Sequence, residues 1–120
     1  MKIQTFTINQ KPGSLNNIFR KHFRKVMAVA EEWHADTIAA LRKEKIRPVK
    51  KYPVMISFYG TWKGKARRDA DNILVKFCMD QMVKSGILLD DDLDHVSFVT
   101  LSGETNGTQE KLEISIIEQE

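Results

Sequence analysis

The six residues VMISFY at positions 54–59 alternate between apolar side chains, beginning with Val54, and side chains of mixed character. Successive side chains of a β-strand point to opposite faces, so this stretch predicts a strand with one buried face. The same kind of pattern recurs on both sides of it, which predicts a sheet rather than an isolated strand. The other predicted strands cover residues 2–8, 95–101 and 110–117.

Two further stretches have the spacing of amphipathic helices. Apolar residues recur at steps of three and four over residues 18–45, which is the stripe of a long helix with one buried face. A second helix is predicted from Asp71 or Asn72, because Asp and Asn cap helix N-termini. It is expected to end near Ser85, since Gly86 suits the position that follows a last helical turn.

The predicted order β-α-β-α-β-β indicates an α+β fold, with two main helices packed against a mixed β-sheet. The 120 residues, 42% of them hydrophobic, suit a single domain over residues 1–120. Between the last two strands, Asn106-Gly107 is a hairpin-type turn signal. The short connection therefore predicts that these two strands pair antiparallel.

The use of cysteine and of apolar residues indicates where the protein works. Cys78 is the single cysteine, so no disulfide can form within the chain, and the composition fits a reducing compartment. No run of about 18 apolar residues is present, and the N-terminal segment lacks the apolar core of a signal peptide. We therefore expect a cytoplasmic protein, with Cys78 acting as a small core residue.

Charge is divided unevenly along the chain. Residues 1–68 contain 16 Lys and Arg against 4 Asp and Glu, whereas residues 69–120 contain 3 against 12. A basic half joined to an acidic half suggests one surface for a polyanion and a separate cluster for cations. An uneven split across a solvated surface, with no partner, is the alternative.

Acidic residues flank the second predicted helix. Asp69 and Asp71 precede it, and the run 90–92 follows it. Residues i and i+2 of an extended segment point the same way, so both acids can face one ion, and Asp91 or a neighbour can join them if the helix turns the chain back. Clustered carboxylates repel one another unless a cation neutralises them, and Mg²⁺ suits such oxygen ligands. Taken separately, Asp69 and Asp71 are better explained as helix-capping residues and the run after the helix as a solvated turn, and it is their combination that favours a metal site.

The sequence at this point resembles a known family. RDADN at residues 68–72, then Lys76, Asp80 and GILLDD at 86–91, is similar to the signature of the RusA-type Holliday junction resolvases. SLNN at 14–17, followed by a basic helix, resembles that family's Ser-x-Asn segment. The resemblance implies a small, dimeric, Mg²⁺-dependent endonuclease of phage or prophage origin, which resolves four-way DNA junctions by paired symmetric nicks.

The resemblance also implies roles for single residues. Asp69, Asp71 and Asp91 match the catalytic, Mg²⁺-binding carboxylates, and Lys76 matches the catalytic lysine of the helix. Here the lysine lies four residues after Asn72, where the family pattern has three, and one residue rotates a helical position by about 100°. A later helix start, a bulge or a non-catalytic Lys76 would each account for this spacing. Either neighbour of Asp91 could take its place, because three aspartates follow one another.

Basic residues upstream of the acids are expected to hold DNA phosphates in a sequence-independent way. Trp62 lies among them and is expected either to stack on an exposed base or to pack the loop down. We expect a C2 homodimer, which matches the two-fold symmetry of a junction, with the apolar surplus of the long helix as its interface. A non-catalytic nucleic-acid-binding module and a nuclease for other branched DNA are the alternatives. The predicted DNA contacts are Arg20, Arg24, Lys63, Lys65, Arg67 and Arg68.

Overall fold

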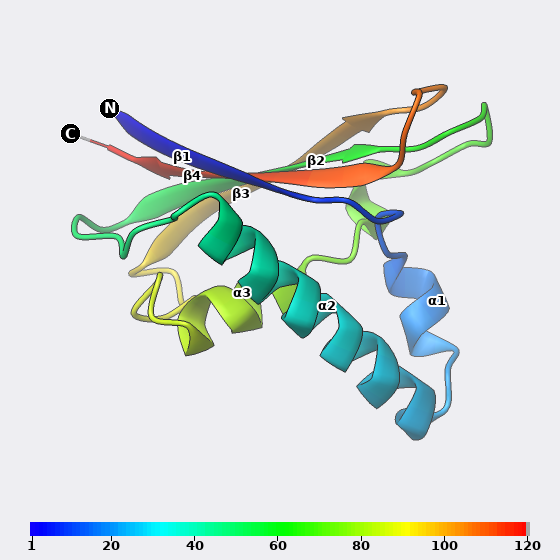
Figure 1. Cartoon of the computed structure of the whole chain (residues 1–120), viewed down its shortest axis with the longest axis horizontal. Helices are drawn as coiled ribbons and strands as arrows, with labels where there is room; N and C mark the ends of the chain where they lie inside the picture. Colours follow the sequence, from blue (N-terminus) through cyan, green and yellow to red (C-terminus); the bar gives the residue numbers. More distant parts are fainter. Residues whose placement is uncertain (120) are drawn as a thin grey trace.

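A mixed four-stranded sheet in the order β1-β4-β2-β3 forms one layer of the molecule, and the helices form the other (Figure 1). This computed structural model describes residues 1–119, without the side chain of Phe19. The arrangement confirms the α+β class. The strands are β1 (Lys2–Ile8), β2 (Val54–Thr61), β3 (Val96–Glu104) and β4 (Lys111–Glu118). The helices are α1 (Leu15–Phe19), α2 (Phe23–Lys43), the 3₁₀ turn η1 (Ala70–Asn72) and α3 (Lys76–Lys84).

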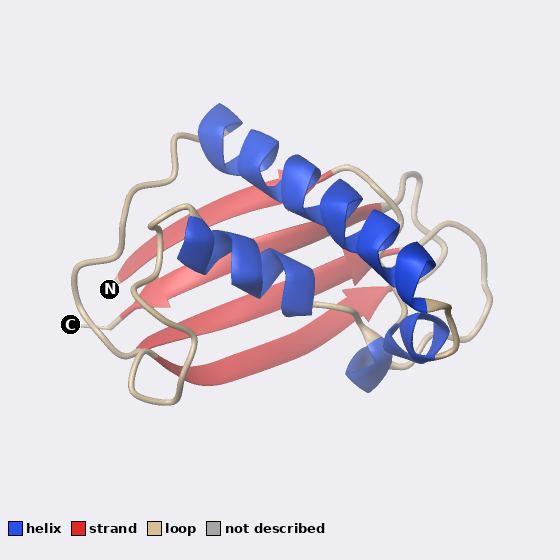
Figure 2. Ribbon diagram, turned by 90° about the horizontal axis from the view of Figure 1, so that it is seen from below, coloured by secondary structure: helices blue, strands red, loops and turns tan. Residues whose placement is uncertain are grey.

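The hydrophobic core lies between the helices and one face of the sheet, which α2 and α3 cover (Figure 2). The alternation predicted for 54–59 is confirmed, because Val54, Ile56 and Phe58 are fully buried on this inner face. β4 supplies Leu112 and Ile114 to the same layer. Within the described part of the chain, no helix is both long and apolar enough to cross a membrane.

The predicted pairing of the last two strands is wrong. β4 lies between β1 and β2 and is antiparallel to both, while β3 pairs parallel with β2 at the edge of the sheet. The turn at Asn106 does not close a hairpin, because its backbone N–H bonds the carbonyl of Gly64, and the N–H of Gly107 bonds the carbonyl of Trp62. The connection after β3 is thus held against the loop that follows β2, and the chain then enters the sheet on the other side of β2.

The long predicted helix is interrupted near its start. α1 ends at Phe19, and α2 begins at Phe23 after a short break. His22 caps α2, since its ring Nδ1 accepts from the backbone N–H of Arg24 at 3.3 Å. α2 ends before the predicted limit, because Lys45 takes a left-handed conformation with φ of 53°.

The second predicted helix is shorter than its sequence pattern suggests. Residues 70–72 form only the 3₁₀ turn η1, and Ile73 is extended, with φ −70° and ψ 126°. Ile73 forms an antiparallel bridge with Ser14, and the N–H of Leu74 donates to the carbonyl of Gly13 at 2.9 Å. Pairing with the N-terminal loop therefore replaces the first helical turn, and α3 proper begins at Lys76. Its end agrees with the prediction, since Gly86 follows it with φ of 81°.

The second face of the sheet carries no helix in the described part of the chain (Figure 1). The strand register aligns one apolar side chain from each strand in a row across this open face. Ile3 and Phe98, at the two ends of the row, are 53% and 59% exposed. We call this set the apolar row; in strand order its members are Ile3, Ile117, Met55 and Phe98.

Candidate nucleic-acid interface

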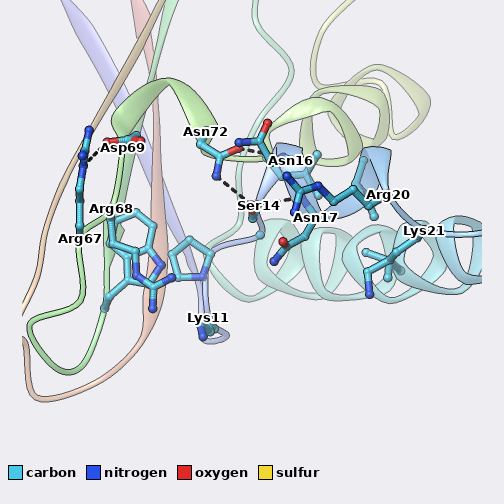
Figure 3. A pocket seen from close by; sticks show the side chains of 16 residues that line it. Lys11, Ser14, Asn16, Asn17, Arg20, Lys21, Arg67, Arg68, Asp69 and Asn72 are labelled. Atoms are coloured by element: carbon cyan, nitrogen blue, oxygen red, sulfur yellow. Dashed lines mark hydrogen bonds and ion pairs between the residues drawn. The ribbon is translucent and has the colours of Figure 1, made fainter.

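Asn72 joins the two segments that carry the sequence resemblance. Its side-chain Nδ2 donates to Ser14 Oγ at 2.8 Å, and its Oδ1 accepts from the backbone N–H of Asn16 at 2.8 Å. Ser14 Oγ also accepts from the N–H of Asn17, and so caps α1. A single amide thus fastens the start of α1 to η1, as Figure 3 shows.

A cleft of about 530 Å³ lies beside this junction and is lined mainly by polar and basic residues. Asp69 is the one acidic residue among its lining. Five cations from three separate segments surround it, so the potential in the cleft is positive and suits a polyanion. The five lining cations are Lys11, Arg20, Lys21, Arg67 and Arg68 (Figure 3).

Asp69 takes part in an ion pair at the edge of the cleft. The Arg67 Nε lies 3.2 Å from its Oδ1, and both side chains are more than half exposed. Of the five lining cations, Arg67 is the only one that forms an ion pair within the described residues. The other four cations are available to bind anions from solution. Arg67 can also leave Asp69 for a phosphate at little cost in free energy, because an exposed ion pair is weak.

Trp62 packs the loop down and is not available as a base-stacking platform. Its side chain is buried, with 6% exposure. The ring lies across a pair of facing glycines, since a Cβ at Gly60 would come within 2.7 Å of it and one at Gly103 within 2.9 Å. Arg68 places its guanidinium carbon 5.9 Å from the ring centroid. Trp62 therefore orients a cation of the cleft.

The three predicted catalytic carboxylates do not form one group within the described part of the chain, where no three His, Cys, Asp or Glu side chains lie together as metal ligands. Asp69 and Asp71 lie at η1, before α3, whereas Asp91 lies in the loop after α3, at the other end of that helix (Figure 2). The nine residues of α3 span about 13 Å. The expected return of the chain to the first two acids does not occur, because the loop after α3 is held against the segment before β2: the carbonyl of Ile87 accepts from the N–H of Val49, and the N–H of Leu89 donates to the Tyr52 hydroxyl.

The extended geometry assumed for both acids holds for one of them. Asp69 is extended, with φ −102° and ψ 129°, but Asp71 lies within the 3₁₀ turn. Both side chains are exposed. Lys76 is the first residue of α3 and pairs with Asp80 at 3.7 Å. The one-residue spacing difference is thus a later helix start, because the backbone between Asn72 and Lys76 is not helical.

The structure divides the predicted DNA contacts. Arg20, Arg67 and Arg68 line the cleft, whereas Lys63, Lys65 and Arg24 are exposed outside it. Sequence reasoning did not assign the polar groups that build the cleft wall. The segment before α1 is rich in loop-forming residues, which was the one sign of these groups in the sequence. The fold shows that this segment pairs with residues 72 and 73. Cleft residues outside the six predicted DNA contacts include Lys11, Lys21, Ser14 and Asn72.

A separate acid–base pair follows α3. His95 Nδ1 lies 2.5 Å from Asp92 Oδ1, and the Asp92 carboxylate also accepts from the His95 backbone N–H. This hydrogen bond raises the pKa of His95 above its ordinary value and lowers the pKa of Asp92. The His95 ring also meets Tyr52 edge-on, with centroids 5.0 Å apart. His95 therefore fixes the acidic loop to the body of the domain.

Comparison of the chain with models of known protein families finds no match, and comparison with curated proteins finds none either.

Proposed function

We propose that this protein is a Mg²⁺-dependent endodeoxyribonuclease that resolves four-way DNA junctions. The observation that carries the proposal is the Asn72 link, which brings the Ser14 segment and the Asp69–Asn72 segment together beside a cleft lined by five cations. These are two of the segments in which the sequence resembles the RusA-type resolvases, and the third, residues 86–91, follows α3 and lies outside the cleft. Ser14 and Asn72 are 58 residues apart in the chain, and the contact between them makes both segments part of one surface.

The basic cleft supplies the grip on DNA. Arg68 and Arg20 approach it from opposite sides, and arginine binds phosphate oxygens through two parallel hydrogen bonds. Lys11 and Lys21 add charge without fixed geometry. Binding of this kind reads the shape of a phosphate backbone and not its sequence.

Asp69 and Asp71 would hold the metal ion. Exposed carboxylates are hard oxygen ligands, and Mg²⁺ is commonly bound through one or two carboxylates with water and substrate phosphate filling the other positions. Asp69 lines the cleft and fits that description, with the Arg67 guanidinium beside its carboxylate where a metal cation would bind, and Asp71 lies two residues further on in η1. When bound, Mg²⁺ activates water and offsets the charge that builds on the phosphodiester. Lys76 would supply a second positive charge near the phosphodiester once its ion pair with Asp80 is broken.

The test compares a synthetic four-way junction with a linear duplex of the same sequence, each with and without Mg²⁺. We expect paired nicks in the junction alone, and only with the metal. Asp71→Asn should abolish nicking and keep binding, because it removes charge from the metal site and leaves the cleft intact. Asp94→Asn is the matched control, since Asp94 is an exposed aspartate of the loop after α3. Normal nicking by Asp71→Asn would refute the site assignment.

Asp91→Asn tests a separate point. Asp91 belongs to the loop between α3 and β3, and Figure 2 shows this loop at the opposite end of α3 from η1, so within one chain Asp91 is not grouped with the two acids of the proposed metal site. If Asp91→Asn also abolishes nicking, a second copy must supply Asp91, and mixed dimers of the Asp71→Asn and Asp91→Asn chains should regain one active site. If it nicks normally, Asp91 is not catalytic.

A non-catalytic nucleic-acid-binding module is the second candidate. The absence of a three-ligand group within residues 1–119 favours it, because the cleft binds phosphate without any metal. Junction binding that is independent of Mg²⁺, with no nicking under any divalent ion, would establish this function. Comparison of nicking rates on flaps and on four-way junctions would separate the resolvase from a nuclease for other branched DNA.

The proposal includes a C2 homodimer, because two symmetric nicks need two sites. We place the second copy on the open face of the sheet, where the apolar row is uncovered and Thr5, Ser57 and Ser115 present no charge. The face is self-complementary for that reason, since a two-fold contact sets like residues against like. Phe98→Asp should shift the sedimentation coefficient to that of a monomer, and Phe23→Asp should leave it unchanged. The opposite result would place the interface on α2, as the sequence first suggested.

A further inference from the structure

An exposed apolar surface lies at the start of α2, next to the cleft. Phe23, the first residue of the helix, is 72% exposed, and Met27 is 49% exposed. Residues i and i+4 of a helix share one face, so the two side chains form a continuous surface. We call this pair the apolar tip.

The apolar tip is held away from the core. The buried residues of α2 begin only at Trp33, so its first ten residues place no side chain fully inside the molecule. Figure 1 shows this end of α2 extending away from the sheet, beside α1. The tip is therefore a projecting feature of a rigid helix whose other half is anchored in the core.

Cations surround the apolar tip. Arg20 and Lys21 precede it and line the cleft, while Arg24 and Lys25 follow on the first turn of α2. A two-fold contact between copies through this surface would set these four cations against four identical ones, which charge repulsion opposes. A polyanion with exposed apolar surface fits it instead. Unstacked bases between phosphates have that combination.

We infer that the apolar tip is a wedge that enters the branch point of a DNA junction, with Phe23 stacking on an unpaired or weakly stacked base. This inference rests on the proposed function, since it names the feature of the substrate that the same cleft recognises. Apolar side chains that enter a base step must overcome stacking, and the cost is smallest where bases are already unpaired. Phe23 would thus recognise the unstacked bases of a branch point, in addition to the backbone shape that the phosphate contacts read. Phe23 would therefore stack on a base, the role that the sequence suggested for Trp62, whose side chain is buried.

The test uses junctions that carry 2-aminopurine either at the branch point or in the middle of an arm. Binding of the wild-type protein should raise fluorescence at the branch point and leave the arm probe unchanged. Phe23→Ala should lose most of that rise and bind the junction roughly fivefold or more weakly, while its affinity for linear duplex stays the same. Phe23→Trp should restore the rise. Leu93→Ala is the matched control, because Leu93 is an apolar residue with 83% exposure in the acidic loop after α3.

The outcomes separate this inference from the proposed function. If the wild-type protein nicks junctions and Phe23→Ala gives the same fluorescence rise, the wedge is refuted and the nuclease stands. If the rise depends on Phe23 but no metal supports nicking, the wedge stands and the nuclease is refuted. If Phe23→Ala instead lowers the sedimentation coefficient of the free protein, the apolar tip is a contact between copies and the inference is overturned. Unchanged circular dichroism would show that the variant is folded, as expected for a side chain so exposed.

Discussion

Ser14 and Asn72 are separated by 58 residues in the sequence, and a hydrogen bond of 2.8 Å from Asn72 Nδ2 to Ser14 Oγ joins them. The same serine oxygen caps α1, so one hydroxyl serves the helix and the link between the two segments. The cleft depends on this arrangement, because Arg20 and Lys21 follow α1 while Arg67 and Arg68 precede η1. If the link is lost, the two basic walls are held together by the backbone pairing of residues 13 and 14 with residues 73 and 74, and their relative position is less firmly fixed.

Asn72→Ala should lower the free energy of unfolding by about 1–2 kcal/mol, since two hydrogen bonds are lost and the Asn16 N–H is left without its partner. Ser14→Ala should cost a similar amount through loss of the cap. In a double-mutant cycle followed by urea denaturation, the two changes should be non-additive by on the order of 1 kcal/mol. Asn16→Ala is the control, because Asn16 contributes its backbone N–H and not its side chain. Additive losses would show that the link carries no coupling.

Junction binding should depend on salt in proportion to the cations of the cleft. Each phosphate contact removed should reduce the slope of log affinity against log salt by about 0.9. We expect this reduction for Arg20→Ala and Arg68→Ala, and none for Lys84→Ala, which removes an exposed cation from the far end of α3. Titrations at several salt concentrations measure it. Equal slopes for all three variants would show that the junction does not bind in the cleft.

The His95–Asp92 pair should give the protein a pH-dependent stability. Because the pKa of His95 is raised, its contribution is present below the ordinary value of 6.5 and is lost as the pH rises through the pKa of the folded state. Because the pKa of Asp92 is lowered, its contribution is present above the ordinary value of 3.8 and is lost as the pH falls through its folded pKa. The pair therefore stabilises most between pH 3.8 and 6.5.

Urea denaturation at a series of pH values, with Asp92→Asn as the variant, measures this effect. The difference in stability between the wild-type and variant proteins should be largest near pH 5 and should shrink on both sides. A difference that is constant with pH would show that the two side chains do not interact in solution.

The thiol of Cys78 should be inert in the folded protein. Burial raises its pKa to about 11, and only 1% of the residue is exposed. A thiol needs both ionisation and access to react. Modification by a disulfide reagent at pH 8 should therefore proceed only at the rate of unfolding, and denaturant should release one reactive thiol. Rapid labelling of the native protein would contradict the packing of α3 against α2.

The sequence predicted those elements whose signals are local. Alternation located the strand at 54–59 and the buried side chains of β4, and the positive φ of Gly86 ends α3 where the sequence indicated. Sequence patterns could not show that β4 enters between β1 and β2, because strand order depends on contacts between distant segments. A turn signal at Asn106 favours reversal of the chain but does not specify which strand receives it.

The candidate site shows the same division. The basic character of residues 63–68 and of Arg20 was visible in the sequence, and three of the predicted contacts line the cleft. The role of Asn72 as a link was not visible, since it depends on Ser14 arriving from another part of the chain. Helical pattern also misled, because Ile73 and Leu74 have the apolar spacing of a helix and instead pair with residues 13 and 14. Tertiary pairing outweighed local propensity there.

The position of β4 sets the order in which the molecule can be assembled. Among the described residues 1–119, β1 has β4 as its only strand neighbour, and β4 follows the other three strands in the sequence. During synthesis, β1 must wait for more than 100 residues before any strand can pair with it. Distant pairing of this kind slows folding. The loops of the cleft follow β1 and β2, so the two walls of the cleft take their final positions only after β4 has paired with both strands.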